Sequence, residues 1–154
     1  MTQFAKKLRG ILEKAGKLDG PTGDLLMAEA QSQKRPVIEV LVKKGIVSDQ
    51  MLLALIAKAA NIPPIDLSKL TVNKEVLESV PAEVASEYGI FPVDKIGNII
   101  TVAVANPFDV LKLDDIRIIT GCQLRPVVST AEEIEKIRSK GYQKESESVD
   151  GILG

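Results

Sequence analysis

The chain has 154 residues, of which 45% are hydrophobic and only 3% aromatic, and its formal net charge is −1. This length can bury a hydrophobic core as one domain or as two small lobes. The near-neutral charge excludes a general attraction to DNA, RNA or anionic lipid, and the scarcity of aromatic rings argues against stacking on single-stranded nucleic acid.

The chain lacks histidine and has one cysteine, Cys122. These two counts exclude Ser–His–Asp triads, Cys–His dyads and nearly all zinc sites, and Cys122 is predicted to be a buried structural thiol. The sequence shows no signal peptide and no apolar run that approaches the roughly 18 residues of a membrane span. We therefore expect a soluble, cytoplasmic protein that holds no metal or cofactor and does not insert into the membrane.

Residues 1–62 are predicted to form a lobe of four helices. The first helix ends near Gly16 and carries a stripe of apolar residues at helical spacing, namely Phe4, Leu8, Ile11 and Leu12. Residues 20–23 are typical of a turn, and a second helix is expected over residues 24–34.

The third and fourth helices resemble a second copy of the first two. Pro36 suits the first turn of a short helix that ends at Gly45, and Ser48 caps the fourth helix. Leu12 and Gly16 recur 29 positions later as Leu41 and Gly45. Leu26 and Pro36 recur 27 positions later as Leu53 and Pro63. The difference of two residues between these offsets predicts an insertion in the turn of the first copy, near Gly20. These matches favour a helix–turn–helix duplication, although any bundle of four similar helices gives some of them.

The second lobe is organised around residues 99–105, which are apolar except for one threonine. A run without charge or alternation predicts a strand buried on both faces. Pro107 ends this strand, Asp109 is the expected N-cap of a helix over residues 110–120, and a further strand is expected over residues 123–129. Strand, helix and strand in this order predict a right-handed βαβ crossover between parallel strands.

Other segments are predicted to cover this crossover. Two short helices are expected after Asn73 and Pro81, and a strand over residues 90–95 forms a hairpin with the buried strand. A last helix is expected from Thr130 to Gly141, where a capping-box pattern begins it and a glycine ends it.

The predicted fold class is therefore α+β. A four-helix lobe at residues 1–62 precedes a small α/β lobe at residues 63–142, whose three-stranded sheet contains one hairpin and one right-handed βαβ crossover. The polar residues 143–154 cannot form a core and are expected to be a linker or a disordered tail.

No arrangement of residues predicts catalysis. The only Gly-Lys pair, at Gly16, lacks the upstream glycine of a phosphate-binding Walker A loop. Without histidine or metal-ligand spacing, we interpret Asp109 as a helix cap and Asp114 and Asp115 as solvated carboxylates. The basic residues of the helical lobe form either an ordinary solvated face or an anion-binding surface; they are Lys6, Lys7, Arg9, Lys34, Arg35, Lys43 and Lys44.

The order of motifs resembles the N-terminal domain of the ATPases of type II secretion and type IV pilus systems. The resemblance covers about residues 37–142 and is carried by three stretches: Leu-Val-Lys-Lys-Gly-Ile-Val-Ser at residues 41–48, Phe-Pro-Val at residues 91–93, and Val-Ala-Asn-Pro-Phe-Asp at residues 104–109. It implies a domain without chemistry of its own, which docks the motor onto the cytoplasmic domain of an inner-membrane platform protein. The ATPase motor would follow downstream of a linker, and the domain would be peripheral to the membrane through its partner.

Some members of this family bind cyclic di-GMP through the duplicated helical motif, in which each copy begins Arg-Leu-Gly. The matching positions here are Lys7-Leu8-Arg9 and Pro36-Val37-Ile38, so both copies lose the glycine and the second also loses the cation. Gly16 and Gly45 are retained but also suit helix ends. The departures predict no binding of cyclic di-GMP at micromolar concentrations.

Three functions therefore remain to be distinguished: an adaptor domain, a cyclic-di-GMP-sensing regulatory domain and, with least support, a small enzyme. If the domain is an adaptor, the first helix is a candidate docking element, because it combines apolar and basic residues near a chain end. The candidate partner-binding residues are Phe4, Lys7, Leu8, Arg9 and Ile11. The alternative is that its apolar stripe packs on the second helix of the same lobe.

Overall fold

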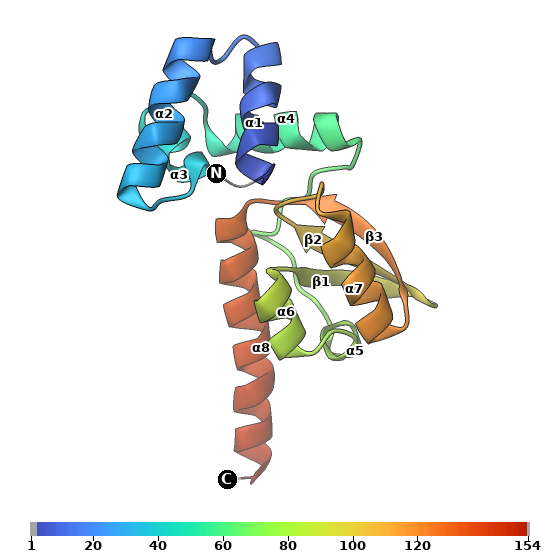
Figure 1. Ribbon diagram of the computed structural model, residues 1–154. Helices are drawn as coiled ribbons and strands as arrows, with labels where there is room; N and C mark the ends of the chain where they lie inside the picture. The colour runs from blue at the N-terminus through green and yellow to red at the C-terminus, as the bar shows by residue number, and fades with distance from the viewer. Residues whose placement is uncertain (1–2, 154) are drawn as a thin grey trace. The chain divides into compact units, whose positions relative to one another are not determined.

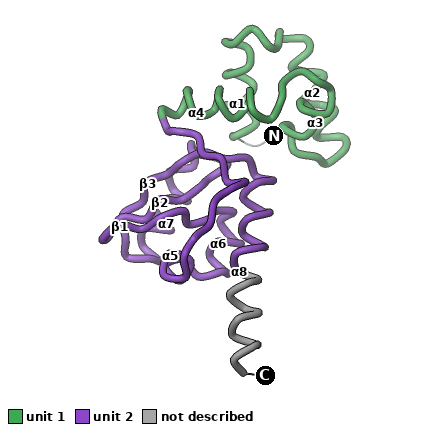
Figure 2. Tube along the Cα trace, turned by 180° about the vertical axis from the view of Figure 1, so that it is seen from behind, with its two compact units in different colours: residues 1–61 green, residues 62–154 purple. Residues whose placement is uncertain are grey.

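The computed structural model describes the side chains of residues 3–142 and the backbone of residues 3–153. The chain forms two compact units, residues 1–61 and residues 62–154 (Figure 2), which divide one residue before the predicted boundary. The linker or disordered tail expected at residues 143–154 lies outside the residues whose side chains are described.

The first unit is helical, as predicted, and its core is built where the helices meet in pairs (Figure 1). Helix α2 packs against α3, and α1 packs against α4. Leu8, Leu12 and Leu41 are completely buried. The helices span Gln3–Lys14 (α1), Gly20–Gln33 (α2), Val37–Lys43 (α3) and Asp49–Ala60 (α4).

Helix α2 begins four residues earlier than predicted, so the expected turn at residues 20–23 is wrong. The side chain of Asp19 accepts a hydrogen bond of 2.7 Å from the backbone N–H of Thr22 and caps the helix. Pro21 lies in the first turn, where its missing N–H costs nothing. Gly and Pro in sequence are typical of turns, but here they stand at a capped helix start.

The two helix pairs share one turn geometry. Gly16 and Gly45 both have φ of +75°, a conformation that glycine adopts without strain. After each glycine, a backbone N–H bonds back to the preceding helix, from Lys17 to the carbonyl of Leu12 at 2.9 Å in the first pair. The next helix is then capped three residues after the glycine, by Asp19 and by Ser48. This correspondence supports the interpretation of a duplication.

The second helices of the two pairs also end alike. Lys34 and Asn61 are both left-handed C-caps, and a proline follows two residues later in each case. However, α2 has 14 residues and α4 has 12. The two additional residues therefore lie inside α2, between Asp19 and Leu26. The insertion is near Gly20, as predicted, but this stretch is the start of a helix and not a turn.

The second unit contains a three-stranded sheet in the order β1-β2-β3. The strands span Phe91–Ile96 (β1), Ile99–Val104 (β2) and Gln123–Val128 (β3). Strand β2 pairs antiparallel with β1 and parallel with β3, and helix α7 (Val110–Thr120) makes the crossover between β2 and β3. The predicted α+β class with one hairpin and one βαβ crossover is confirmed.

Both faces of the sheet are covered. Side chains of β2 alternate, so that Val102 and Val104 pack with α7 on one face and Ala103 packs with α8 on the other. Val102 and Val104 are 0% and 3% exposed, as the apolar run predicts. The covering helices are α5 (Lys74–Glu78), α6 (Ala82–Tyr88), α7 and α8 (Ala131–Leu153), and Figure 1 shows them around the sheet.

Helix α8 continues past Gly141, which was predicted to end it. A Cβ atom at this position would lie 3.3 Å from the Phe91 ring and 3.6 Å from Leu77, so the glycine allows the helix to approach β1 and α5 closely. The next residue, Tyr142, donates a hydrogen bond of 2.8 Å to the carbonyl of Val80. Close packing therefore favours glycine at position 141, which does not end the helix.

Cys122 is half-buried, where a fully buried thiol was predicted. It packs against the core on the α7 side of the sheet. Its position directly after Gly121, at the start of β3, leaves one side of the residue towards solvent. The residue remains a packing element, although an incompletely covered one.

Candidate functional site

The first candidate nucleotide-binding triplet, Lys7-Leu8-Arg9, is divided between surface and core. Leu8 is completely buried, whereas Lys7 is exposed. Arg9 forms ion pairs of 2.8 Å with Glu13 and 2.7 Å with Asp24, and it donates a hydrogen bond of 3.0 Å to the carbonyl of Gly20. These contacts raise the pKa of Arg9, first through the hydrogen bonds to Glu13 and Asp24. The guanidinium therefore ties α1 to α2.

The second triplet, Pro36-Val37-Ile38, forms a helix start. Pro36 is the N-cap of α3 and contributes no side-chain hydrogen bond, and Val37 and Ile38 are half-buried. Neither apolar side chain offers a charge or a hydrogen bond to an anion. The structure thus gives each of the two triplets a structural role.

A cavity of about 610 Å³ lies between α1 and α4 of the helical unit. Four lysines and no carboxylate line it, and Ile11 and Leu55 add an apolar wall; the lysines are Lys6, Lys7, Lys14 and Lys58. The positive charge of four ammonium groups around one hollow attracts anions and repels cations. This cavity is therefore a candidate anion-binding feature of the helical unit.

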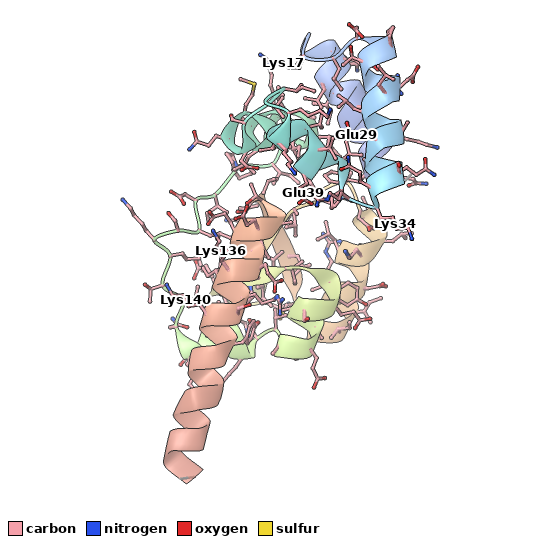
Figure 3. The ribbon with its side chains drawn as sticks, turned by 90° about the vertical axis from the view of Figure 1, so that its left-hand side faces the viewer. Lys17, Glu29, Lys34, Glu39, Lys136 and Lys140 are labelled. Atoms are coloured by element: carbon pink, nitrogen blue, oxygen red, sulfur yellow. The ribbon has the colours of Figure 1, made fainter. Side chains whose placement is uncertain are left out.

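A smaller cavity of about 250 Å³ lies between α2 and α3, at a place that corresponds to the larger cavity. Arg35 and Lys43 stand 29 positions after Lys6 and Lys14 of the larger cavity. Here, however, carboxylates are present from both helices, since Glu29 lies on α2 and Glu39 on α3 (Figure 3).

The carboxylates of the smaller cavity form ion pairs with two of its three cations. Lys44 lies 2.9 Å from Glu29, and Arg35 lies 3.7 Å from Glu39. The helical unit therefore has two hollows at corresponding places, and only one of them is purely basic. A two-fold symmetric anion would meet carboxylates on one side.

The docking residues predicted on α1 face largely into the helical unit. Leu8 is completely buried, and Phe4 and Ile11 are half-buried. Leu8 is therefore not available to a partner in this structure. Docking through the remaining α1 residues stays a prediction.

The outer face of α7, in the second unit, was not predicted as a functional feature. Four of its apolar side chains are largely exposed: Val110 by 60%, Leu111 by 78%, Ile118 by 79% and Ile119 by 49%. The buried face of the helix uses only Leu113 and Ile116. The sequence contains a usable signal, because six large apolar residues in 11 positions exceed what one buried face of a helix can hold.

The acidic residues near strand ends behave as predicted. Asp109 caps α7 by accepting a hydrogen bond of 3.1 Å from the N–H of Lys112, and Asp114 and Asp115 are exposed. Within the described part of the chain, no group of three or more acidic or cysteine side chains could hold a metal ion. No helix there is long and apolar enough to cross a membrane.

Comparison with known proteins relates both units to one kind of protein. Residues 60–148 match the MshEN domain family. The chain is 27% identical over 126 residues to the type IV pilus assembly ATPase PilB of Myxococcus xanthus, and 27% identical over 139 residues to PilB of Thermus thermophilus. These matches cover 82% and 89% of this chain but 22% and 16% of the relatives, so the chain spans about a fifth of their length.

Solved structures show the same fold. A structure of MshE with cdg superposes with a TM-score of 0.72 at 17% identity, over 86% of this chain and 96% of that one. The N-terminal domain of XpsE superposes with a TM-score of 0.66 at 19% identity, over 90% of this chain and 96% of that one. At these identities the likeness establishes the architecture, including the helical unit before the α/β unit.

Proposed function

Because the chain belongs to the MshEN domain family, we propose that it is a non-catalytic adaptor that docks a pilus-assembly or secretion ATPase onto the cytoplasmic domain of its inner-membrane platform protein. The observation that carries the proposal is the match to the pilus ATPases, which spans most of this chain but only about a fifth of theirs. A domain that is separate from the motor of such an ATPase is suited to connect the ATPase to another protein.

The proposal places the protein in the cytoplasm, bound to the inner membrane through its partner. The downstream motor domain is its second, covalent partner. Two further features support binding rather than chemistry: an uncovered apolar helix face on α7, and carboxylates that cap helices or face solvent.

The test uses the full-length ATPase and a variant that lacks this domain. Both are mixed with membrane vesicles that contain the platform protein, and with vesicles that do not. We expect only the full-length ATPase to sediment, and only with the vesicles that contain the platform. Equal sedimentation of the truncated ATPase would show that the domain is not the adaptor.

A regulatory domain that senses cyclic di-GMP is the second candidate. The lysine-lined cavity between α1 and α4 favours it, as does the likeness to a structure described as MshE with cdg. Against it stand the two altered triplets and the carboxylates Glu29 and Glu39, which occupy the related hollow.

We therefore expect no binding of cyclic di-GMP at micromolar concentrations. Calorimetric titration of the nucleotide into the chain checks this expectation. A saturable micromolar complex would contradict it and would make nucleotide sensing the better account of the helical unit. The variant Lys14→Ala then shows whether the nucleotide occupies the basic cavity, because the affinity falls only if it does.

A further inference from the structure

The largest concentration of exposed apolar side chains in the described chain lies on α7. Seven large hydrophobic residues are exposed between residues 3 and 142, and four of them belong to this one helix of 11 residues. Single exposed apolar residues are normal on protein surfaces, but a group on one element marks an interaction site.

The two most exposed residues of the group form a stripe. Leu111 and Ile118 stand seven positions apart, which places them on one side of the helix about 10 Å from each other. This side is opposite to the face that packs on the sheet through Leu113 and Ile116. Figure 1 shows that α7 covers the sheet.

Acidic groups lie between and beside these two anchors. Asp114 and Asp115 are three and four positions after Leu111 and are both exposed. Asp114 forms an ion pair of 2.5 Å with Arg117, whereas no ion pair within the described residues engages Asp115. The free acidic charge of the stripe is therefore that of Asp115.

Helix α6 adds to this negative charge. Burial of Tyr88, together with the carboxylates of Asp115 and Glu87, raises the pKa of its hydroxyl, so Asp115 and Glu87 both lie near Tyr88. Glu83 stands one helical turn before Glu87 and is exposed. Asp115 of the stripe and Glu87 of α6 thus both lie near Tyr88.

This charge pattern disfavours a second copy of the chain as the occupant. In a symmetric antiparallel pair of α7 helices, Leu111 would meet Ile118 of the other copy, and Asp114 and Asp115 of both copies would meet at the centre. Four carboxylates brought together and dehydrated oppose such a contact. The surface instead complements apolar side chains with a cation between them.

We propose that the outer face of α7, with Leu111 and Ile118 as apolar anchors and Asp115 as the charge between them, is the docking surface for the platform protein, through a segment that presents a lysine or arginine between two apolar side chains. This inference rests on the proposed adaptor function. It assigns that function to the second unit rather than to helix α1.

The test measures binding of the platform protein's cytoplasmic domain to the chain and to three variants. The double variant Leu111→Ser with Ile118→Ser removes both anchors, and Asp115→Lys reverses the charge. Leu25→Ser is the matched control, since Leu25 is 73% exposed on α2 and lies outside the stripe. Melting curves verify that each variant is folded, which is expected because all substituted side chains are exposed.

We expect about tenfold or greater loss of affinity for the double variant and for Asp115→Lys, and wild-type affinity for Leu25→Ser. Double-variant binding within about twofold of the wild type would overturn the assignment of the surface while leaving the adaptor function intact. Failure of the wild type itself to bind would overturn both proposals. A homodimer that the double variant dissociates in sedimentation would instead assign the stripe to a second copy and overturn the inference.

Discussion

Several side chains of this protein cap helix ends through hydrogen bonds, and Asp19 is the clearest case. Its carboxylate accepts the bond from Thr22 at the start of α2, and that bond lowers the pKa of Asp19 below its ordinary value of 3.8. The bond therefore stabilises the folded chain fully at pH values above the ordinary pKa of Asp19. This contribution is lost as the pH falls through the lowered pKa of the folded state.

We expect Asp19→Ala to lower the melting temperature at neutral pH. The difference from the wild type should shrink when both proteins are melted at a pH below the pKa of Asp19, because the wild-type carboxyl is then neutral as well. A difference that is the same at both pH values would show that the charge of Asp19 does not contribute.

Gly141 offers a second test at this scale, because its role depends on packing. Gly141→Val places two methyl groups towards the Phe91 ring, and we expect a loss of about 1–3 kcal/mol in the free energy of unfolding. Ser139→Val, on the exposed side of α8, is the control and should change stability little. The measurement is urea unfolding, and equal effects of the two substitutions would contradict the packing role.

The caps could be predicted from the sequence, but the role of Gly141 could not. Ser48, Asn73 and Asp109 each precede an apolar helical run, and each accepts the predicted bond. A glycine in a helical run looks the same whether it ends the helix or admits a neighbouring ring. Only the position of Phe91 from another element distinguishes the two.

Strand β2 carries the core of the second unit, and its burial gives a direct prediction. We expect Val104→Asp to lower the free energy of unfolding by about 3 kcal/mol or more, because it buries a charge without a partner. Ile96→Asp on β1 is the matched control, since Ile96 is 70% exposed. Thermal unfolding of both variants checks the strand assignment, which would be wrong if Val104→Asp melted at the wild-type temperature.

Helix α1 was expected either to dock a partner or to pack within its lobe. The complete burial of Leu8 leads us to expect that Phe4→Ala with Leu8→Ala lowers the melting temperature by several degrees, since truncation of a buried leucine costs about 2–5 kcal/mol. Phe4→Ala alone separates the contribution of the half-buried ring. Lost platform binding at an unchanged melting temperature would instead restore α1 as the docking element.

Helices and strands could be predicted where the hydrophobic pattern was clear. They were missed where one sequence pattern is typical of two different structures. The apolar run of β2 and the capped helix α7 agree with prediction. The start of α2 did not, because Gly20 and Pro21 suit a turn as well as a first helical turn. The outer face of α7 was missed because residues 110–120 were interpreted only as the helix of the βαβ crossover.

At the scale of the molecule, the division into two units follows from two separate cores. Pro63 and Pro64 connect the units, and backbone hydrogen bonds tie this segment to β3: Ile65 donates to Val128 at 2.9 Å, and Val128 donates to Pro63 at 3.0 Å. The connecting segment is therefore an ordered part of the second unit. Its pairing with β3 could not be predicted from the sequence, because the hydrogen-bond partner lies more than 60 residues later in the chain.

The proposed adaptor function rests on features of the whole domain. The family match and the exposed apolar face of α7 are the observations that support this proposal. The sequence indicated this role through a resemblance, whereas the candidate surface required the exposure of individual side chains.

Calorimetric titration of the platform's cytoplasmic domain into the intact chain measures whether this domain binds the platform protein. We expect a saturable one-to-one complex that forms without any nucleotide. Absence of a complex at concentrations at which both proteins are folded would contradict the adaptor function.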